Sequence, residues 1–239
     1  MLLKPWDTLP KEMQKEEVRP YYDCLRPRRA ALMLKRAMDF LLSLLLVVVL
    51  SPLMLVLAIW IKADSKGPVF FRQTRVTQYG RTFRIFKFRT MVSDAEQKGS
   101  GVTMKNDSRI TRVGEKIRHS RLDEIPQLLN VLTGDMSFVG ARPEIPRYVA
   151  QYTPEMMATL LLPAGITSLA SIRFKDEEKL LQDAETVDQV YVQEILPRKM
   201  EYNLEYLRQF TFLKDIRLLF QTAFHVAGFS GKGDKQTQA

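Results

Sequence analysis

The sequence predicts an α+β fold that is mainly helical, with a short antiparallel β-hairpin, amphipathic interfacial helices and an N-terminal membrane helix. Three observations predict this fold. Residues 40–61 form an apolar run without a single charge. Residues 67–91 place β-branched and aromatic side chains on both sides of a glycine turn, which is typical of a hairpin. Several later segments repeat apolar residues at helical spacing.

The charge balance favours anionic partners. The chain has 239 residues and a formal net charge of +9, and its length fits one large domain or two small ones. A surplus of Lys and Arg indicates nucleic acid, anionic lipid or phosphorylated substrates. The single cysteine, Cys24, excludes an internal disulfide framework. Two histidines argue against zinc, so if the protein uses a metal, Mg²⁺ with oxygen ligands is expected.

Residues 1–34 form a polar arm punctuated by prolines. The pattern predicts a short helix and an arm on the membrane surface, with Trp6, Tyr21 and Tyr22 as anchors at the headgroups. A partly ordered tail fits the same composition.

The apolar segment, residues 35–64, is long enough to cross a membrane. Its uncharged part has roughly 22 residues, which at about 1.5 Å per residue span the hydrocarbon layer if the helix is straight. Because the run begins well inside the chain and no small-residue cleavage site follows it, we expect no signal peptide.

Two features favour a re-entrant helix over a straight crossing. Ser51-Pro52 lies in the middle of the run, and proline breaks or bends a helix while the Ser51 hydroxyl can bond a freed carbonyl. Basic residues flank both ends, which holds both on the cytoplasmic side. We therefore expect a helix-break-helix that dips into one leaflet; a spanning helix and a buried core helix are the alternatives.

Residues 65–228 form the expected cytoplasmic domain. After the hairpin, with its turn at Gly80, we expect a polar loop at 92–111. A helix, a break and a second helix follow within 112–132, then a loop at 133–146 and helical sequence from Pro154. Residues 161–175 predict a loop and a short strand.

The C-terminal third is expected to be helical. Residues 176–181 and 188–209 have helical patterns, the second interrupted by Pro197. The last helix carries an apolar stripe of Leu213, Ile216, Phe220 and Phe224, for which we favour packing on the core over a membrane interface. Residues 229–239 are expected to be disordered.

The adjacent carboxylates Asp123 and Glu124 are the first candidate for chemistry. Pro126 is tolerated only in the first turn of a helix, so a helix begins near residues 123–126. Its free N–H groups and dipole would keep both carboxylates ionised, with depressed pKa values. Adjacent positions point about 100° apart, so the two groups would divide the labour of nucleophile and metal ligand. Simple helix-stabilising charge explains the same pair.

Basic residues could supply the complement to these carboxylates. The strand "FRIFKFRT" interleaves Arg84, Lys87 and Arg89 with apolar residues, and "GARP" fixes Arg142 between a glycine and a proline. That presentation suits a two-pronged grip on phosphate, although solvated surface charge is the plainer reading of each residue alone. A nucleic-acid surface is a further reading, but no recognised binding motif accompanies these residues.

Taken together, these motifs resemble the monotopic phosphoglycosyl transferases, or bacterial sugar transferases. The resemblance covers about residues 34–225, and the stretch from 120 to 143 is highly specific. The matching segments are "KRAMDF…SP", "GPVFFRQTRV", "FRIFKFRTM", "SRLDEIPQLLNVLTGDMSFVGARPE" and "LPAGITS".

The resemblance implies a reaction and its participants. Members move a phosphosugar from a UDP-sugar to polyprenyl phosphate, giving polyprenyl-diphosphate-sugar and UMP, at the cytoplasmic face of the bacterial inner membrane. This is the first membrane step of glycoconjugate biosynthesis, and it requires Mg²⁺. The resemblance also implies a re-entrant helix broken at Ser51-Pro52 and a catalytic dyad of Asp123 and Glu124.

Site roles follow from the resemblance. Asp123 is the expected nucleophile and, with Glu124, a metal ligand; the expected substrate-binding residues are Lys87, Arg89, Thr90, Arg142, Pro143 and Arg173. Two departures concern this set. Ala141 replaces a common proline, and Ser168, Ser171 and Arg173 lie where many members have another sequence, which would alter sugar preference.

The expected partners are a UDP-sugar, polyprenyl phosphate and the phospholipid bilayer, without nucleic acid. The sequence leaves a homodimer open. The alternative function is a membrane-tethered basic module, without catalysis, that binds anionic lipid or nucleic acid.

Overall fold

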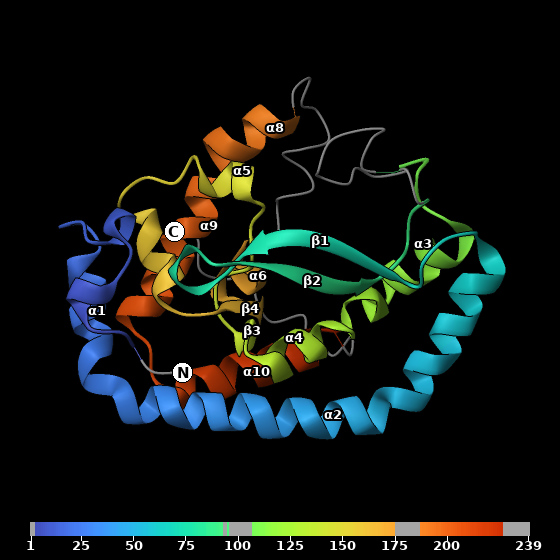
Figure 1. The fold of residues 1–239 in the computed structure, drawn as a ribbon, viewed down its shortest axis with the longest axis horizontal. Coiled ribbons are helices and arrows are strands. Elements are labelled where there is room, and N and C mark those ends of the chain that lie inside the picture. The colour runs from blue at the N-terminus through green and yellow to red at the C-terminus, as the bar shows by residue number, and fades with distance from the viewer. Residues whose placement is uncertain (1–2, 93–94, 96–106, 175–186, 227–239) are drawn as a thin grey trace, which may run out of the picture.

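The computed structural model describes residues 3–92, 95, 107–174 and 187–226, and the described part is mostly helical. Figure 1 shows the long helix α2 (Arg29–Asp64) along one side, with α1 (Arg19–Leu25) at one end and α3 (Arg112–His119) at the other. Two small two-stranded sheets lie between these helices and the remaining ones. The expected class, mainly helical α+β, is confirmed.

The N-terminal arm is part of the main core. Short 3-10 helices at Trp6–Thr8, Lys11–Met13 and Arg26–Arg28 flank α1 on the way to α2. Tyr21 and Tyr22 are buried in the main hydrophobic cluster. These two rings are therefore not available to lipid headgroups as the sequence suggested.

Helix α2 is bent rather than broken. It runs without interruption through Pro52, and Figure 1 shows a bend in its second half. Pro52 has no N–H for the carbonyl of Val48, four residues earlier. The Ser51 hydroxyl donates to that same carbonyl at 2.8 Å. The expected separation into two helices is therefore wrong, because Ser51 satisfies the one acceptor that the proline leaves open.

The faces of α2 are reversed relative to an ordinary surface helix. Its polar residues Lys35, Asp39 and Ser43 are completely buried against the domain. The outward face is an apolar stripe of Met33, Leu34, Phe40, Leu41, Leu44, Leu45, Val48, Val49, Leu53, Leu55, Val56, Ile59 and Trp60. A continuous exposed apolar surface of this length marks a contact with lipid or protein. Among the described residues, this is the one helical stretch long and apolar enough to cross a membrane.

The predicted hairpin is confirmed. Strand β1 (Phe70–Val76) pairs antiparallel with β2 (Thr82–Phe88), in a register from Phe70 opposite Phe88 to Val76 opposite Thr82. The connection uses two left-handed residues, Tyr79 at φ 59° and Gly80 at φ 74°. Glycine adopts this conformation without steric cost, which explains why the turn forms there.

A second sheet lies where the sequence predicted a loop. Strand β3 (Met136–Val139) pairs in parallel with β4 (Ala164–Thr167), so only the short strand expected within 161–175 is confirmed. The two segments are joined through α5 (Pro146–Val149) and a 3-10 helix at Met156–Leu161. All four β3 residues are buried, so no alternation of polar and apolar residues marks the strand in the sequence.

The helices around the carboxylates follow the prediction. Helix α3 is followed by the 3-10 helix η6 (Leu122–Glu124) and then by α4 (Gln127–Thr133). Further on come α6 (Leu169–Arg173), α8 (Val187–Val190), a π-helical turn at Tyr191–Ile195 and α9 (Leu196–Arg208). Pro197 occupies the first turn of α9, where proline is tolerated, and does not interrupt it.

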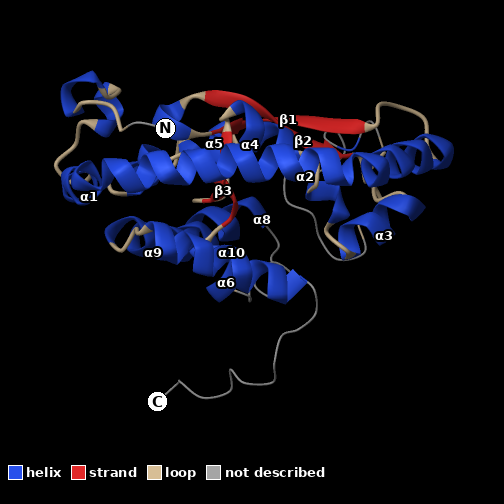
Figure 2. Ribbon diagram, turned by 90° about the horizontal axis from the view of Figure 1, so that it is seen from below, coloured by secondary structure: helices blue, strands red, loops and turns tan. Residues whose placement is uncertain are grey.

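The last helix, α10 (Phe212–Val226), turns its apolar stripe outward. Leu213, Phe220 and Phe224 are 77%, 62% and 60% exposed. The expectation that this stripe packs on the core is wrong, because Asp215 and Leu218 face the core instead. Figure 1 shows α10 running along α2, and the two helices are in contact. Figure 2, seen from below, shows α10 and α9 on the same side of α2. The helix expected at 176–181, most of the loop at 92–111 and the C-terminal tail lie outside the described residues.

Candidate active site

The site is centred on Glu124, which two cations hold. The Nζ of Lys87 lies 3.0 Å from Glu124 Oε1, and Nη2 of Arg142 lies 2.5 Å from the same oxygen. Nη1 of Arg142 also reaches Glu124 Oε2 at 3.4 Å. The side chain of Lys87 is 22% exposed, that of Arg142 is 31% exposed and that of Glu124 is 14% exposed. The cluster is therefore partly accessible to solvent, and its one carboxylate lies between two cations.

Lys87 is positioned because α4 is fixed to the free edge of β2. The side chain of Asn130 on α4 accepts from the backbone N–H of Phe86 at 2.8 Å and donates to the carbonyl of Arg84 at 3.1 Å. These two bonds mimic a strand partner and hold α4 against the hairpin. The turn that precedes α4, and with it Glu124, is thereby brought to Lys87.

Arg142 is positioned by the parallel sheet. The backbones pass so closely that a Cβ on Gly165 would lie 2.2 Å from the nitrogen of Gly140, a clash that only glycine avoids. The loop after β3 is then fixed by Gly165, which donates to the carbonyl of Ala141 at 2.8 Å. Arg142 itself donates to the carbonyl of Ile166 at 3.2 Å. The guanidinium therefore points at Glu124 from a rigid support.

The carboxylate pair lies in a turn of its own. Arg121 adopts a left-handed conformation, at φ 55°, and reverses the chain after α3. Asp123 and Glu124 follow in η6, while α4 begins at Gln127 with Pro126 just before it. The predicted helix start at 123–126 is thus displaced by a short 3-10 turn, and the pair precedes the helix rather than lying within it.

The environment separates the pKa values of the two carboxylates. Burial alone would raise the pKa of Glu124, but the charges of Arg142 and Lys87 outweigh it and hold the pKa far below its usual range. Glu124 therefore stays ionised, as the sequence predicted. Burial also lowers the pKa of Lys87, which Glu124 opposes.

Asp123 behaves differently, and its expected depressed pKa is wrong. Burial raises the pKa of Asp123 above 3.8, Lys87 lowers it and the neighbouring Glu124 adds to the rise. Among the described residues, no basic side chain forms an ion pair with the Asp123 carboxylate, because Glu124 has taken both cations. A half-buried carboxylate without a direct counter-ion is more basic and more nucleophilic than a paired one.

Arg89 and Thr90 lie elsewhere in the fold. Arg89 is buried and donates to the carbonyls of Ser65 at 2.7 Å and Lys66 at 3.0 Å, at the end of α2. The structure thus uses Arg89 to cap α2 and does not bring it to the carboxylates. Thr90 is buried under α3: its carbonyl accepts from Thr111 at 2.9 Å, and a Cβ on Gly114 would meet that carbonyl oxygen at 2.1 Å.

Of the two remaining expected substrate-binding residues, Pro143 lies next to the site and Arg173 forms an ion pair on the surface. Pro143 follows Arg142, and its carbonyl accepts from Arg75 at 3.1 Å. Arg173 ends α6 and forms an exposed ion pair with Glu205 at 2.8 Å. Two residues near the site were missed: Arg75, behind the loop, and Arg118, whose charge lowers the pKa of Asp123. No sequence spacing pointed to either, because each approaches from another element.

The donor set fits a magnesium ion only in part. Among the residues that the structure describes, no group of three or more His, Cys, Asp or Glu could hold a metal ion. Mg²⁺ commonly binds to one or two carboxylates and completes its shell with substrate phosphates and water. Asp123 and Glu124 could supply these carboxylates. Asp123 is the one that forms no ion pair with a cation among the described residues.

Comparison with known proteins identifies the family. Residues 30–228 match the family described as "Bacterial sugar transferase". The chain is 38% identical to the UDP-N-acetylgalactosamine-undecaprenyl-phosphate N-acetylgalactosaminephosphotransferase of Aeromonas hydrophila, over 79% of this chain and 42% of that protein. It is 36% identical to the UDP-glucose:undecaprenyl-phosphate glucose-1-phosphate transferase of Escherichia coli (strain K12), over 84% of this chain and 41% of that protein.

A further relative matches over more of its length. The UDP-glucose:undecaprenyl-phosphate glucose-1-phosphate transferase of Caulobacter vibrioides is 35% identical, over 82% of this chain and 70% of that protein. The chain spans about two fifths of the length of the two relatives named first. Because the family match extends over most of the chain, from the start of α2 to the end of α10, this protein belongs to the bacterial sugar transferase family.

Proposed function

We propose that the protein transfers a phosphosugar from a UDP-sugar to polyprenyl phosphate, releasing UMP. The names of its relatives support this, since they describe transfer to undecaprenyl phosphate from UDP-N-acetylgalactosamine or UDP-glucose. The net charge of +9 suits a donor and an acceptor that both carry phosphate.

The observation that carries the proposal is the division of roles within the carboxylate pair. Glu124 is neutralised by Lys87 and Arg142, while Asp123, next to it, has no direct counter-ion among the described residues. An arrangement built only for helix stability would need neither cation. A nucleophile beside a cationic cluster is what attack on a negatively charged phosphate requires.

In the first step, a carboxylate oxygen of Asp123 attacks the sugar-bearing phosphorus of the donor. A new P–O bond forms, and the bond from that phosphorus to the bridging oxygen breaks. The electron pair leaves with UMP, and a phosphosugar-aspartate remains. Lys87 and Arg142 stabilise the charge that develops on the phosphate oxygens.

In the second step, an oxygen of polyprenyl phosphate attacks the same phosphorus. The bond to Asp123 breaks, the carboxylate is restored, and polyprenyl-diphosphate-sugar is released. A Mg²⁺ ion held by the carboxylate pair and the donor phosphates would neutralise phosphate charge during both steps. The sugar remains open, with Ser168, Ser171 and Arg173 expected to influence it.

The membrane arrangement follows from α2 and α10. Both turn apolar side chains outward, and both ends of α2 pack against the same domain. We infer that the bent helix lies in one leaflet with both ends on the cytoplasmic side, in the inner membrane. This depth lets the site meet the phosphate of a lipid acceptor at the membrane surface.

The test is UMP release by the purified full chain, in detergent or lipid nanodiscs, across a panel of UDP-sugars. Release should require polyprenyl phosphate and stop when a chelator removes Mg²⁺. With the acceptor omitted, a donor labelled in the sugar should leave its label on the protein. Asp123→Asn should abolish both the label and turnover.

Asp188→Asn, which changes a carboxylate remote from Glu124, is the matched control and should retain both. Near-normal turnover by the Asp123→Asn variant would overturn the nucleophile assignment. Salt-sensitive nucleic-acid binding without UMP release would instead favour the alternative of a non-catalytic basic module.

A further inference from the structure

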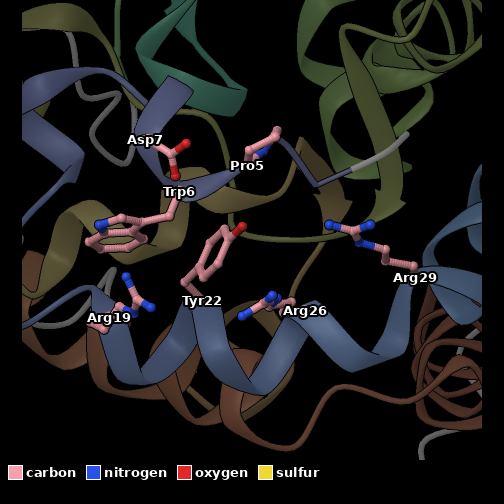
Figure 3. Close-up of a pocket in the computed structure, with 7 residues that line it drawn as sticks. All are labelled: Pro5, Trp6, Asp7, Arg19, Tyr22, Arg26 and Arg29. Carbon is pink, nitrogen blue, oxygen red and sulfur yellow. The ribbon is translucent and has the colours of Figure 1, made fainter.

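A small basic pocket lies in the N-terminal arm, ahead of the residues that match the family. It has a volume of about 190 Å³ and lies where the first 3-10 helix meets α1 and the start of α2. Figure 3 shows Tyr22 between Trp6 on one side and Arg26 and Arg29 on the other. The family match begins at residue 30, so all the residues that line the pocket, from Pro5 to Arg29, precede it.

One wall of the pocket is fixed by aromatic contacts. The rings of Trp6 and Tyr22 meet edge to face, 5.1 Å apart. Arg19 lies over the Trp6 ring at 4.7 Å and forms an ion pair with Asp23 at 3.1 Å. The Tyr22 hydroxyl donates to the carbonyl of Lys4 at 3.0 Å. This wall is therefore already built and its own cation already paired.

The opposite wall carries two cations without a partner. Within the described part of the chain, neither Arg26 nor Arg29 forms a side-chain hydrogen bond or an ion pair, and the one acidic residue that lines the pocket is Asp7. Figure 3 shows the Arg29 guanidinium directed towards Tyr22. Two guanidinium groups that line one pocket complement the charge of a phosphate group and can bind its oxygens by hydrogen bonds.

The pocket lies at the start of the apolar stripe of α2. Arg29 is four residues, about one helical turn, before Met33, which is 52% exposed and begins the stripe. If the stripe enters lipid, the pocket is at the level of the headgroups. Trp6, whose side chain is only half-buried, suits that level because an indole ring is both apolar and polar.

We propose that Arg26 and Arg29 form a phosphate-binding site, with the Trp6–Tyr22 wall at its side. Its ligand is a phosphate group, either of an anionic lipid headgroup or free in solution. The site is separate from the carboxylate cluster and does not rest on the proposed reaction.

Trp6 provides a direct readout of this site. The chain has two tryptophans, Trp6 and Trp60, so Trp60→Phe leaves Trp6 as the only one. The full chain with this change is titrated in detergent with inorganic phosphate. A saturable change in Trp6 fluorescence is expected, and Arg26→Gln with Arg29→Gln should abolish it. Lys11→Gln with Lys15→Gln removes the same charge from the same arm, outside the pocket, and should preserve it.

Vesicles distinguish the two sources of phosphate. Flotation with phosphatidylcholine vesicles is compared with vesicles that contain phosphatidylglycerol, at about 0.3 M salt to screen diffuse attraction. The pocket double variant should lose about tenfold or more in affinity for the anionic vesicles, and the lysine double variant less than about twofold.

A fluorescence response to soluble phosphate identifies free phosphate as a ligand. A response and an affinity loss seen only with anionic vesicles identify the headgroup. The proposal is overturned if the pocket variant and the lysine variant behave alike in both experiments. Circular dichroism of each variant confirms that the chain is still folded.

Discussion

Lys35 on α2 and Asp215 on α10 form a wholly buried ion pair, with 2.5 Å between Nζ and Oδ2. Lys35 also donates to the carbonyl of Val139 at 2.8 Å, and Asp215 accepts from the Tyr206 hydroxyl at 2.8 Å. The pair thus joins both helices with outward apolar faces to the end of β3, from which the Arg142 loop continues. This buried contact therefore connects the outward apolar face of α2 with the strand from which the Arg142 loop continues.

Breaking this pair on one side should destabilise the protein strongly. Lys35→Met or Asp215→Leu leaves an unpaired buried charge, and each should lower the free energy of unfolding by about 3–5 kcal/mol. The double variant should recover most of that loss, since apolar residues of similar size replace both charges. Urea unfolding in detergent measures the difference. Arg173→Gln, in an exposed pair, should cost less than about 1 kcal/mol; equal losses in all variants would contradict the prediction.

Arg89 should affect stability and not substrate binding. Arg89→Gln removes charged hydrogen bonds to Ser65 and Lys66 at the end of α2, and should lower the free energy of unfolding by about 2–3 kcal/mol. The KM for the UDP-sugar should stay within about twofold. Lys87→Gln should do the reverse, raising KM with little loss of stability. A large rise in KM for Arg89→Gln without destabilisation would restore the phosphate role expected from the sequence.

The fork geometry of Arg142 should matter as much as its charge. Arg142→Lys keeps the charge but cannot bond Glu124 and the carbonyl of Ile166 together. We expect kcat/KM to fall on the order of 10²-fold, as for other small misplacements of a site group. Arg147→Lys, at an exposed pair with Asp188, is the matched control and should change kcat/KM less than about threefold. Steady-state rates of UMP release give kcat/KM for both variants, and equal values would contradict the prediction.

The pH dependence of labelling should report on Asp123. As the proposed nucleophile, Asp123 would react only when ionised, and burial raises its pKa above 3.8, so the labelling rate should rise as pH rises through that pKa. Glu124→Gln removes the negative neighbour that helps to raise the pKa of Asp123, so the acidic side of the pH–rate curve should move to lower pH. Lys87→Met removes a cation that lowers the pKa of Asp123, so the acidic side of the curve should move to higher pH. Rates are normalised to each variant's plateau, and shifts in the same direction would refute the assignment.

Local patterns were enough for the hairpin and for the helix-break-helix around the carboxylates. β-Branched and aromatic residues on both sides of a glycine turn specify β1 and β2 within neighbouring residues. Pro126 limits where the following helix can begin. The strand β3 could not be found in this way, because all four of its residues are buried and its parallel partner lies far along the chain.

Whether a basic residue belongs to the site depended on which other element of the fold lies beside it. Lys87 and Arg89 are both basic and lie two residues apart, one on β2 and the other just after its last residue, Phe88. The turn with Glu124 lies beside Lys87, while the end of α2 lies beside Arg89. Nothing local distinguishes the two positions, so the sequence assigned both to phosphate.

The sequence by itself determined that residues 40–61 are removed from water, that a hairpin precedes the carboxylate pair, and that Asp123 and Glu124 lie near a break between two helices. Each of these features depends on neighbours along the chain. Only the tertiary structure decided which face of α2 is turned outward, because Lys35 finds its counter-ion in Asp215, 180 residues later. It also decided that both cations bind Glu124 and leave Asp123 without one. Charges and hydrogen bonds act across space, and their partners are fixed only when the elements have packed.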